Sequence, residues 1–185
     1  MNKKILIFVT VILVLTVVLG VAKKLLATQT ADITVTVTVR KLSVSVSPAT
    51  LAFGLVNEGT TTVAGSAIVV TNDGNLTENY DVKLTNPVGW TAIQSGSPST
   101  DQYKLGAIFK TLAPVAGDFV DSEDMISTIF VTSSATLFAK NTDVAGEKGF
   151  SVVASATRNL WFGFFAPSLT TVGTQQSITV TLRAS

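Results

Sequence analysis

The stretch ITVTVTV at residues 33–39 alternates apolar and threonine side chains along its whole length. A period of two places all the apolar side chains on one face of an extended chain, so the stretch predicts a β-strand with one face to bury. The stretch LSVSV at residues 42–46 alternates in the same way. Its apolar positions are even-numbered, whereas those of the first stretch are odd-numbered, so we expect a bulge or hinge at Arg40-Lys41. Pro48 ends the second strand, because proline cannot donate to a ladder.

Further segments have the composition and length of short strands and are separated by turn residues. They cover residues 51–56, 66–71, 79–85, 90–94, 102–109, 126–131, 149–156, 159–165 and 176–183. Asp73-Gly74, between two of them, is typical of a tight hairpin turn. Many short strands with regular turns predict an all-β fold, an antiparallel β-sandwich of immunoglobulin-like or jelly-roll-like build.

The N-terminus has the pattern of an export leader. Lys3 and Lys4 precede an apolar run over residues 5–21, and small residues follow. We therefore expect an N-terminal hydrophobic export helix, with residues 1–22 removed as a signal peptide. The run is also long enough for a membrane-spanning helix of about 17–25 residues, so an uncleaved anchor is the alternative. Either outcome predicts an extracellular or cell-surface protein that meets the membrane only through its leader.

Beyond the leader we expect an N-terminal arm over residues 23–41 and a single β-sandwich domain over residues 42–185. The chain has no Cys and no His. This excludes a disulfide framework, the usual nucleophile–base pairs and imidazole metal sites, and we expect no enzymatic activity. All 12 acidic residues follow residue 31, whereas four of the 13 basic residues precede it. The domain has no basic cluster, so we expect no nucleic-acid partner.

The stretch VSPATLAFGLV at residues 46–56 is followed by Gly59 and by IVVTNDGN at residues 68–75. This succession resembles the opening half of the immunoglobulin-like domains of Hydin-type, surface-layer-associated and other bacterial and archaeal secreted surface proteins. The likeness covers about residues 46–84, and residues 159–165 depart from the pattern. It implies a structural or adhesive surface module.

A looser likeness concerns layout alone. An export leader, a short β-rich arm and a Cys-free sandwich are similar to the build of secreted fibre subunits of the TasA and camelysin group and of certain archaeal pilins. That layout implies that the terminal strand of one subunit completes the sheet of its neighbour.

The arm is the first candidate site. As a donor strand, residues 32–39 would add to the sheet edge of the next subunit and insert Ile33, Val35, Val37 and Val39 into pockets. The alternative is an ordinary first strand of the same domain.

The aromatic stretch NLWFGFF at residues 159–165 is the second candidate. In a strand, Phe162 and Phe164 face one way, and Trp161 and Phe165 face the other. The latter pair forms a subunit interface, a platform on which a sugar stacks, or a face covered by a second layer. A glycan-binding module would use Trp90, Tyr103 or Trp161.

Two further candidates are short local patterns. The acidic side chains of Asp118, Asp121, Glu123 and Asp124 are candidate calcium ligands, the only cofactor that the sequence suggests, and the alternative is a solvated connecting loop. Asn75, in the sequence Asn-Leu-Thr, is a candidate glycosylation site in an exposed turn.

These features together favour a secreted structural protein that polymerises with itself into an extracellular fibre, pilus-like filament or surface coat. Assembly would use strand addition through residues 32–39 and packing around Trp161 and Phe165. One alternative is a cell-surface adhesin or carbohydrate-binding module. Another is a pilin-like subunit that keeps residues 5–21 as a filament-core helix.

Overall fold

The computed structural model describes residues 30–140 and 145–185 and, before them, only Lys3, Thr10, Ile12 and Leu13. The chain divides into two units, residues 1–38 and residues 39–185. The expected export helix over residues 1–22 therefore lies almost entirely outside the described residues. Within the described part, no helix is long and apolar enough to cross a membrane.

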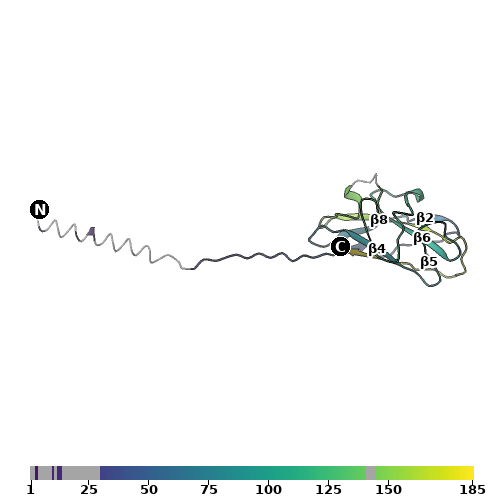
Figure 1. The fold of residues 1–185 in the computed structure, drawn as a ribbon, viewed down its shortest axis with the longest axis horizontal. Helices are drawn as coiled ribbons and strands as arrows, with labels where there is room; N and C mark the ends of the chain where they lie inside the picture. Colours follow the sequence, from purple (N-terminus) through teal and green to yellow (C-terminus); the bar gives the residue numbers. More distant parts are fainter. Residues whose placement is uncertain (1–2, 4–9, 11, 14–29, 141–144) are drawn as a thin grey trace. The chain divides into compact units, whose positions relative to one another are not determined.

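Residues 39–185 fold into two packed β-sheets, which confirms the expected all-β sandwich (Figure 1). The strands are β1 (Val44–Ser47), β2 (Thr61–Val63), β3 (Ile68–Asn72), β4 (Tyr80–Thr85), β5 (Thr91–Ala92), β6 (Gln102–Phe109), β7 (Val131–Thr132), β8 (Thr157–Phe165) and β9 (Thr179–Ala184). Two short 3₁₀ turns, η1 (Ala116–Asp118) and η2 (Ala145–Glu147), interrupt the loops.

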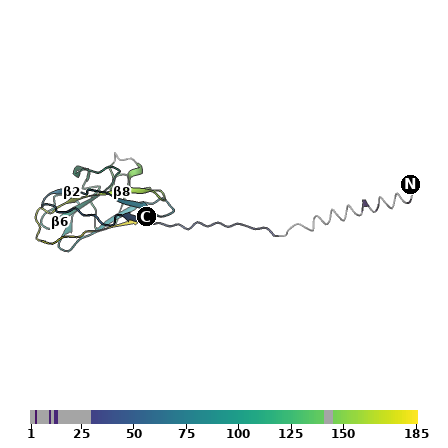
Figure 2. The same cartoon turned by 180° about the vertical axis from the view of Figure 1, so that it is seen from behind.

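The larger sheet has the order β1-β3-β8-β6-β5, with β2 also paired to β8, and the smaller sheet has the order β7-β4-β9. The short β5–β6 pair is parallel, and the other pairs are antiparallel. The C-terminus lies at one end of the sandwich, and β2 and β6 lie towards the other (Figures 1 and 2).

The core lies between the sheets and is built from alternate side chains of the long strands. Val70 of β3, Val82 of β4 and Leu160 of β8 are fully buried there, as are Tyr103 and Phe109 of β6. Each such side chain contributes about 1.5–3 kcal/mol of transfer free energy. In β6 the side chains from Tyr103 to Phe109 are buried on both faces, so the alternation in its sequence does not correspond to an exposed face.

Some predicted strands are absent or shortened. Residues 51–56 and the arm residues 32–39 form no strand. Of residues 126–131 only Val131 enters a strand, and of residues 149–156 only Val152 pairs, in an isolated bridge to Glu78. Strand β2 was not expected. Apolar alternation alone cannot predict these cases, because a strand also needs a partner edge within hydrogen-bonding distance.

The expected hairpin at Asp73-Gly74 is wrong. The two strands that flank it, β3 and β4, belong to different sheets, so residues 73–79 cross between the sheets. Gly74 is required there for space, because a Cβ at this position would collide with the Glu78 carboxylate and the Lys41 carbonyl.

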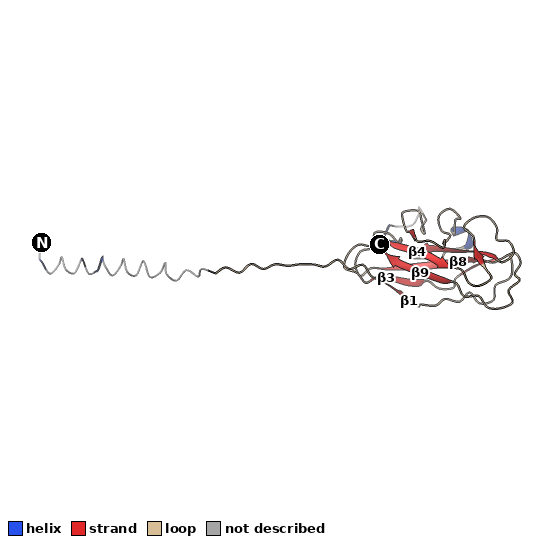
Figure 3. Cartoon of the chain, turned by 60° about the horizontal axis from the view of Figure 1, so that its bottom comes forward, coloured by secondary structure: helices blue, strands red, loops and turns tan. Residues whose placement is uncertain are grey.

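The two long sides of the sandwich differ. On one side, residues 124–127 bridge the sheets: the Ile126 N–H donates to the Leu105 carbonyl of β6, and the Leu84 N–H of β4 donates to the Ser127 carbonyl, both at 2.9 Å. On the other side, β1 and β9 are both edge strands (Figure 3). The sandwich is therefore bridged along one side, and along the other no described segment pairs with the outer edge of β1 or β9.

Candidate functional site: an open groove between the sheets

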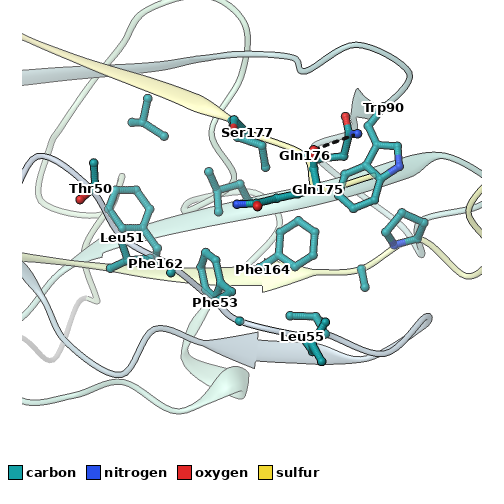
Figure 4. A pocket seen from close by; sticks show the side chains of 18 of the residues that line it. Thr50, Leu51, Phe53, Leu55, Trp90, Phe162, Phe164, Gln175, Gln176 and Ser177 are labelled. Carbon is teal, nitrogen blue, oxygen red and sulfur yellow. Dashed lines mark hydrogen bonds between the residues drawn. The ribbon is translucent and has the colours of Figure 1, made fainter. Parts of the chain in front are cut away.

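A groove of about 1120 Å³ runs along the side where β1 and β9 are edges. One wall is β1 and residues 48–56, and the other is residues 172–178 and β9. Figure 4 shows Leu51, Phe53 and Leu55 on one wall and Gln175, Gln176 and Ser177 on the other. The sequence did not predict this groove, because it arises from two edges that are far apart in the chain.

The floor of the groove is aromatic and apolar. Phe162 and Phe164 of β8 point into it, and the Phe164 ring lies 5.6 Å from that of Phe53 and 5.9 Å from that of Trp90. Trp90 is held in place by a 3.0 Å hydrogen bond from its Nε1 to Thr170 Oγ1. The groove is therefore a continuation of the hydrophobic core that reaches the surface.

The β9 wall presents an apolar row with a period of two. Ile178, Val180 and Leu182 line the groove and are only partly buried. An apolar row on an edge strand, beside an open core, is the arrangement that monomeric sheet proteins normally protect.

The main chain of β9 is also available on this side. Asn79 and Ser185 exchange both of their main-chain hydrogen bonds at 2.9 Å. Because hydrogen-bonded and non-bonded pairs alternate in an antiparallel ladder, Thr181 and Arg183 also bond to β4, whereas Val180 and Leu182 direct their N–H and C=O groups to the free edge.

The arm carries the matching chemistry. Its four apolar side chains are between 76% and 87% exposed: Ile33, Val35, Val37 and Val39. A solvent-exposed apolar row on an extended segment is costly in water, so the arm is a candidate interaction surface.

Asn75 and Asp73 hold residues 39–43, at the base of the arm, through hydrogen bonds that we call the clamp. The Asn75 side chain accepts a hydrogen bond from the Lys41 N–H at 2.8 Å and donates one to the Val39 carbonyl at 2.7 Å. The main-chain N–H groups of Asn75 and Asp73 donate to the carbonyls of Lys41 and Ser43. The clamp lies at Arg40-Lys41, where the sequence pattern changes parity. The predicted glycosylation site is thus also the residue that holds the arm, and a glycan on its Nδ2 would compete with the bond to Val39.

The Trp161 and Phe165 face of β8 lies under a second layer. Both side chains are half-buried and pack with Ile108, Phe119 and Met125. The Trp161 Nε1 donates to the Lys110 carbonyl at 2.9 Å, and the Lys104 ammonium lies 4.7 Å from the centre of the Phe165 ring.

The other two candidate glycan-binding aromatics lie within the sandwich. Tyr103 is fully buried, and its hydroxyl donates to Asn86 Oδ1 at 3.0 Å. Trp90 is half-buried at one end of the groove. The structure therefore does not bring Trp90, Tyr103 and Trp161 together on one exposed face.

The acidic segment is paired with lysines. Asp118 binds Lys110 at 3.2 Å and also Lys140, and Asp121 binds Lys104 at 2.6 Å. The Asp124 carboxylate accepts the Val120 N–H at 2.7 Å. Across the described ranges, no group of three or more acidic side chains is placed to hold a metal ion, and this holds for Glu123 as well.

Electrostatics agree with this pairing. Burial alone would raise the pKa of Asp118, but hydrogen bonds from Lys140, the Val115 N–H and Lys110 outweigh it and lower the pKa to about 2. The carboxylate is therefore ionised at neutral pH and is held as a structural anchor of the layer over β8.

Comparison of the chain with protein-family models, curated proteins and solved structures finds no match.

Proposed function

We propose that this protein is a secreted structural subunit that polymerises with itself into an extracellular fibre or surface coat by β-strand addition. The domain is an immunoglobulin-like sandwich that lacks one edge strand, and the arm over residues 32–39 supplies that strand to another copy. The observation that carries the proposal is that one chain contains both an exposed apolar row and an apolar groove of about 1120 Å³.

The energetics favour insertion of the whole arm at once. Each of the apolar side chains Ile33, Val35, Val37 and Val39 gains about 1.5–3 kcal/mol on full burial. Association costs about 4–15 kcal/mol, so one or two inserted side chains offset only the lower part of that range. A row of four contributes about 6–12 kcal/mol, which offsets most of that range, and main-chain hydrogen bonds add to it.

The symmetry of the contact favours a polymer. The arm of one copy and the groove of the next are different surfaces, so the contact is heterologous, and such contacts build open chains unless the rotation closes a ring. The leader pattern in the sequence supports an extracellular location for that polymer.

The test is electron microscopy of residues 23–185 beside residues 41–185, with circular dichroism to show that both are folded. We expect fibres from the longer form and folded monomers from the shorter form. Monomers from both forms would contradict the proposal and would favour the glycan-binding alternative, which a glycan array then tests.

A further inference from the structure

The unpaired edge of β9 has the spacing and polarity to accept the arm in one defined register. We propose that the arm of a second copy pairs antiparallel with β9, with Val37 opposite Val180 and Val35 opposite Leu182. This inference rests on the proposed function and specifies the acceptor, the direction and the register of the contact.

The side-chain patterns of the two segments match over their full length. Residues 33–39 read ITVTVTV and residues 178–184 read ITVTLRA, so both place an apolar residue at every second position. In the proposed register Ile33, Val35, Val37 and Val39 lie opposite Ala184, Leu182, Val180 and Ile178. A shift of two residues in either direction leaves one apolar arm residue without a partner.

The main chain supports the same pairing. Val180 and Leu182 direct their N–H and C=O groups to the free edge, as the exchange between Asn79 and Ser185 requires. Residues opposite each other in an antiparallel ladder point to the same face of the sheet. A strand that bonds to Val180 and Leu182 through Val37 and Val35 therefore directs its apolar face into the groove and its threonines to solvent.

The clamp favours insertion of the arm into the groove of a second copy over insertion into the groove of its own domain. The pairing of β1 with β3 continues through Ser43 and Lys41, which accept from the N–H groups of Asp73 and Asn75, so this stretch of chain runs straight into β1. Insertion of the arm into its own groove requires a reversal near Val39, which breaks the hydrogen bond that Val39 accepts from Asn75.

The proposed contact also has a defined direction. β1 begins beside the turn over residues 73–79, and β9 ends there, because Ser185 pairs with Asn79. An arm that continues the direction of β1 is antiparallel to β9 when copies repeat without inversion. An arm folded back into its own groove would be parallel to β9, so the two cases are distinguishable.

Engineered disulfides test the register, because the chain has no cysteine of its own. The variant Thr36→Cys/Thr181→Cys places two thiols on the outer face at directly opposite positions, where the short separation of a non-hydrogen-bonded pair suits a disulfide. Thr34→Cys/Thr181→Cys and Thr38→Cys/Thr181→Cys are the matched controls for a two-residue shift. Oxidised samples of residues 23–185 are run on non-reducing gels after microscopy.

We expect a covalent ladder from Thr36→Cys/Thr181→Cys that collapses to monomer on reduction, and its loss in both shifted variants. A ladder only from a shifted variant overturns the register. A fast-migrating monomer with an internal disulfide would show that the arm pairs with β9 of its own chain, and would overturn the proposal that a second copy donates it. Fibres without any crosslink would overturn β9 as the acceptor strand but leave the proposed function intact. The absence of fibres in the unmodified protein would overturn both the proposed function and this inference.

Discussion

At the scale of single residues, Asn75 is the centre of the clamp at the base of the arm. Its side chain bonds to two main-chain groups at the base of the arm, the Lys41 N–H and the Val39 carbonyl. Each such bond contributes about 0.5–1.5 kcal/mol. Asn75 therefore fixes residues 39–41, from which the arm begins.

Replacement of Asn75 tests this role. We expect Asn75→Ala to leave the sandwich folded, to speed proteolytic cleavage near residues 39–41, and to reduce fibre yield. The matched control is Thr77→Ala, which also removes the glycosylation sequence but keeps the clamp. Equal cleavage rates and fibre yields in the two variants would show that the clamp does not control the arm.

Asp118 gives the fold a dependence on pH. Its folded pKa of about 2 lies below the value of about 3.9 for an unfolded aspartate, so its stabilisation is complete above about pH 5 and is lost as the pH falls through about 4 towards 2. The full effect is about 2 kcal/mol. We expect Asp118→Asn to lower the melting temperature at pH 7 and to flatten its decline between pH 5 and pH 2. A decline as steep as in the unmodified protein would contradict this assignment.

At the scale of secondary structure elements, β6 and β8 depend on two facing glycines. A Cβ at either Gly106 or Gly163 would lie 2.7 Å from the ring of Phe119, which packs over both strands. The glycines thus make the space in which the second layer covers Trp161 and Phe165.

Substitution of these glycines tests the packing of that layer. We expect Gly106→Ala or Gly163→Ala to destabilise the domain by about 1–3 kcal/mol, because the Phe119 ring must shift. Gly65→Ala is the control, since a Cβ there meets nothing within 4 Å. Denaturant unfolding measures the difference, and equal midpoints for all three variants would contradict the account.

The same elements show how much the sequence can predict. β3, β4, β6, β8 and β9 were all expected, because each has apolar residues at alternate positions. The sheet to which each strand belongs could not be predicted, since pairing depends on partners distant in the chain, and the groove follows from that pairing. One signal was present: residues 178–182 repeat the alternation of residues 33–37 almost letter for letter.

The candidate residues divide in the same way. The apolar row of the arm could be predicted from its periodicity. The sequence could not predict which lysines pair with Asp118 and Asp121, or that other side chains cover Trp161. In both cases the contacting residues come from other segments of the chain. A cluster of carboxylates in sequence has the same composition whether it binds calcium or lysine.

At the scale of the whole molecule, the domain is asymmetric. Residues 124–127 bridge both sheets along one side, whereas β1 and β9 leave an apolar groove along the other. If residues 32–39 of another copy complete the open side, as we propose, we expect the subunit to reach its full stability only in the polymer.

Electron microscopy of two charge variants of residues 23–185 tests this claim most directly. Val35→Asp/Val37→Asp places two carboxylates on the groove-facing side of the arm, and Thr34→Asp/Thr36→Asp places the same charges on the outer side. We expect folded monomers from the first variant, because a buried unpaired carboxylate is strongly disfavoured, and fibres from the second. Fibres from both variants, or from neither while the unmodified protein polymerises, would contradict insertion of the apolar face into the groove.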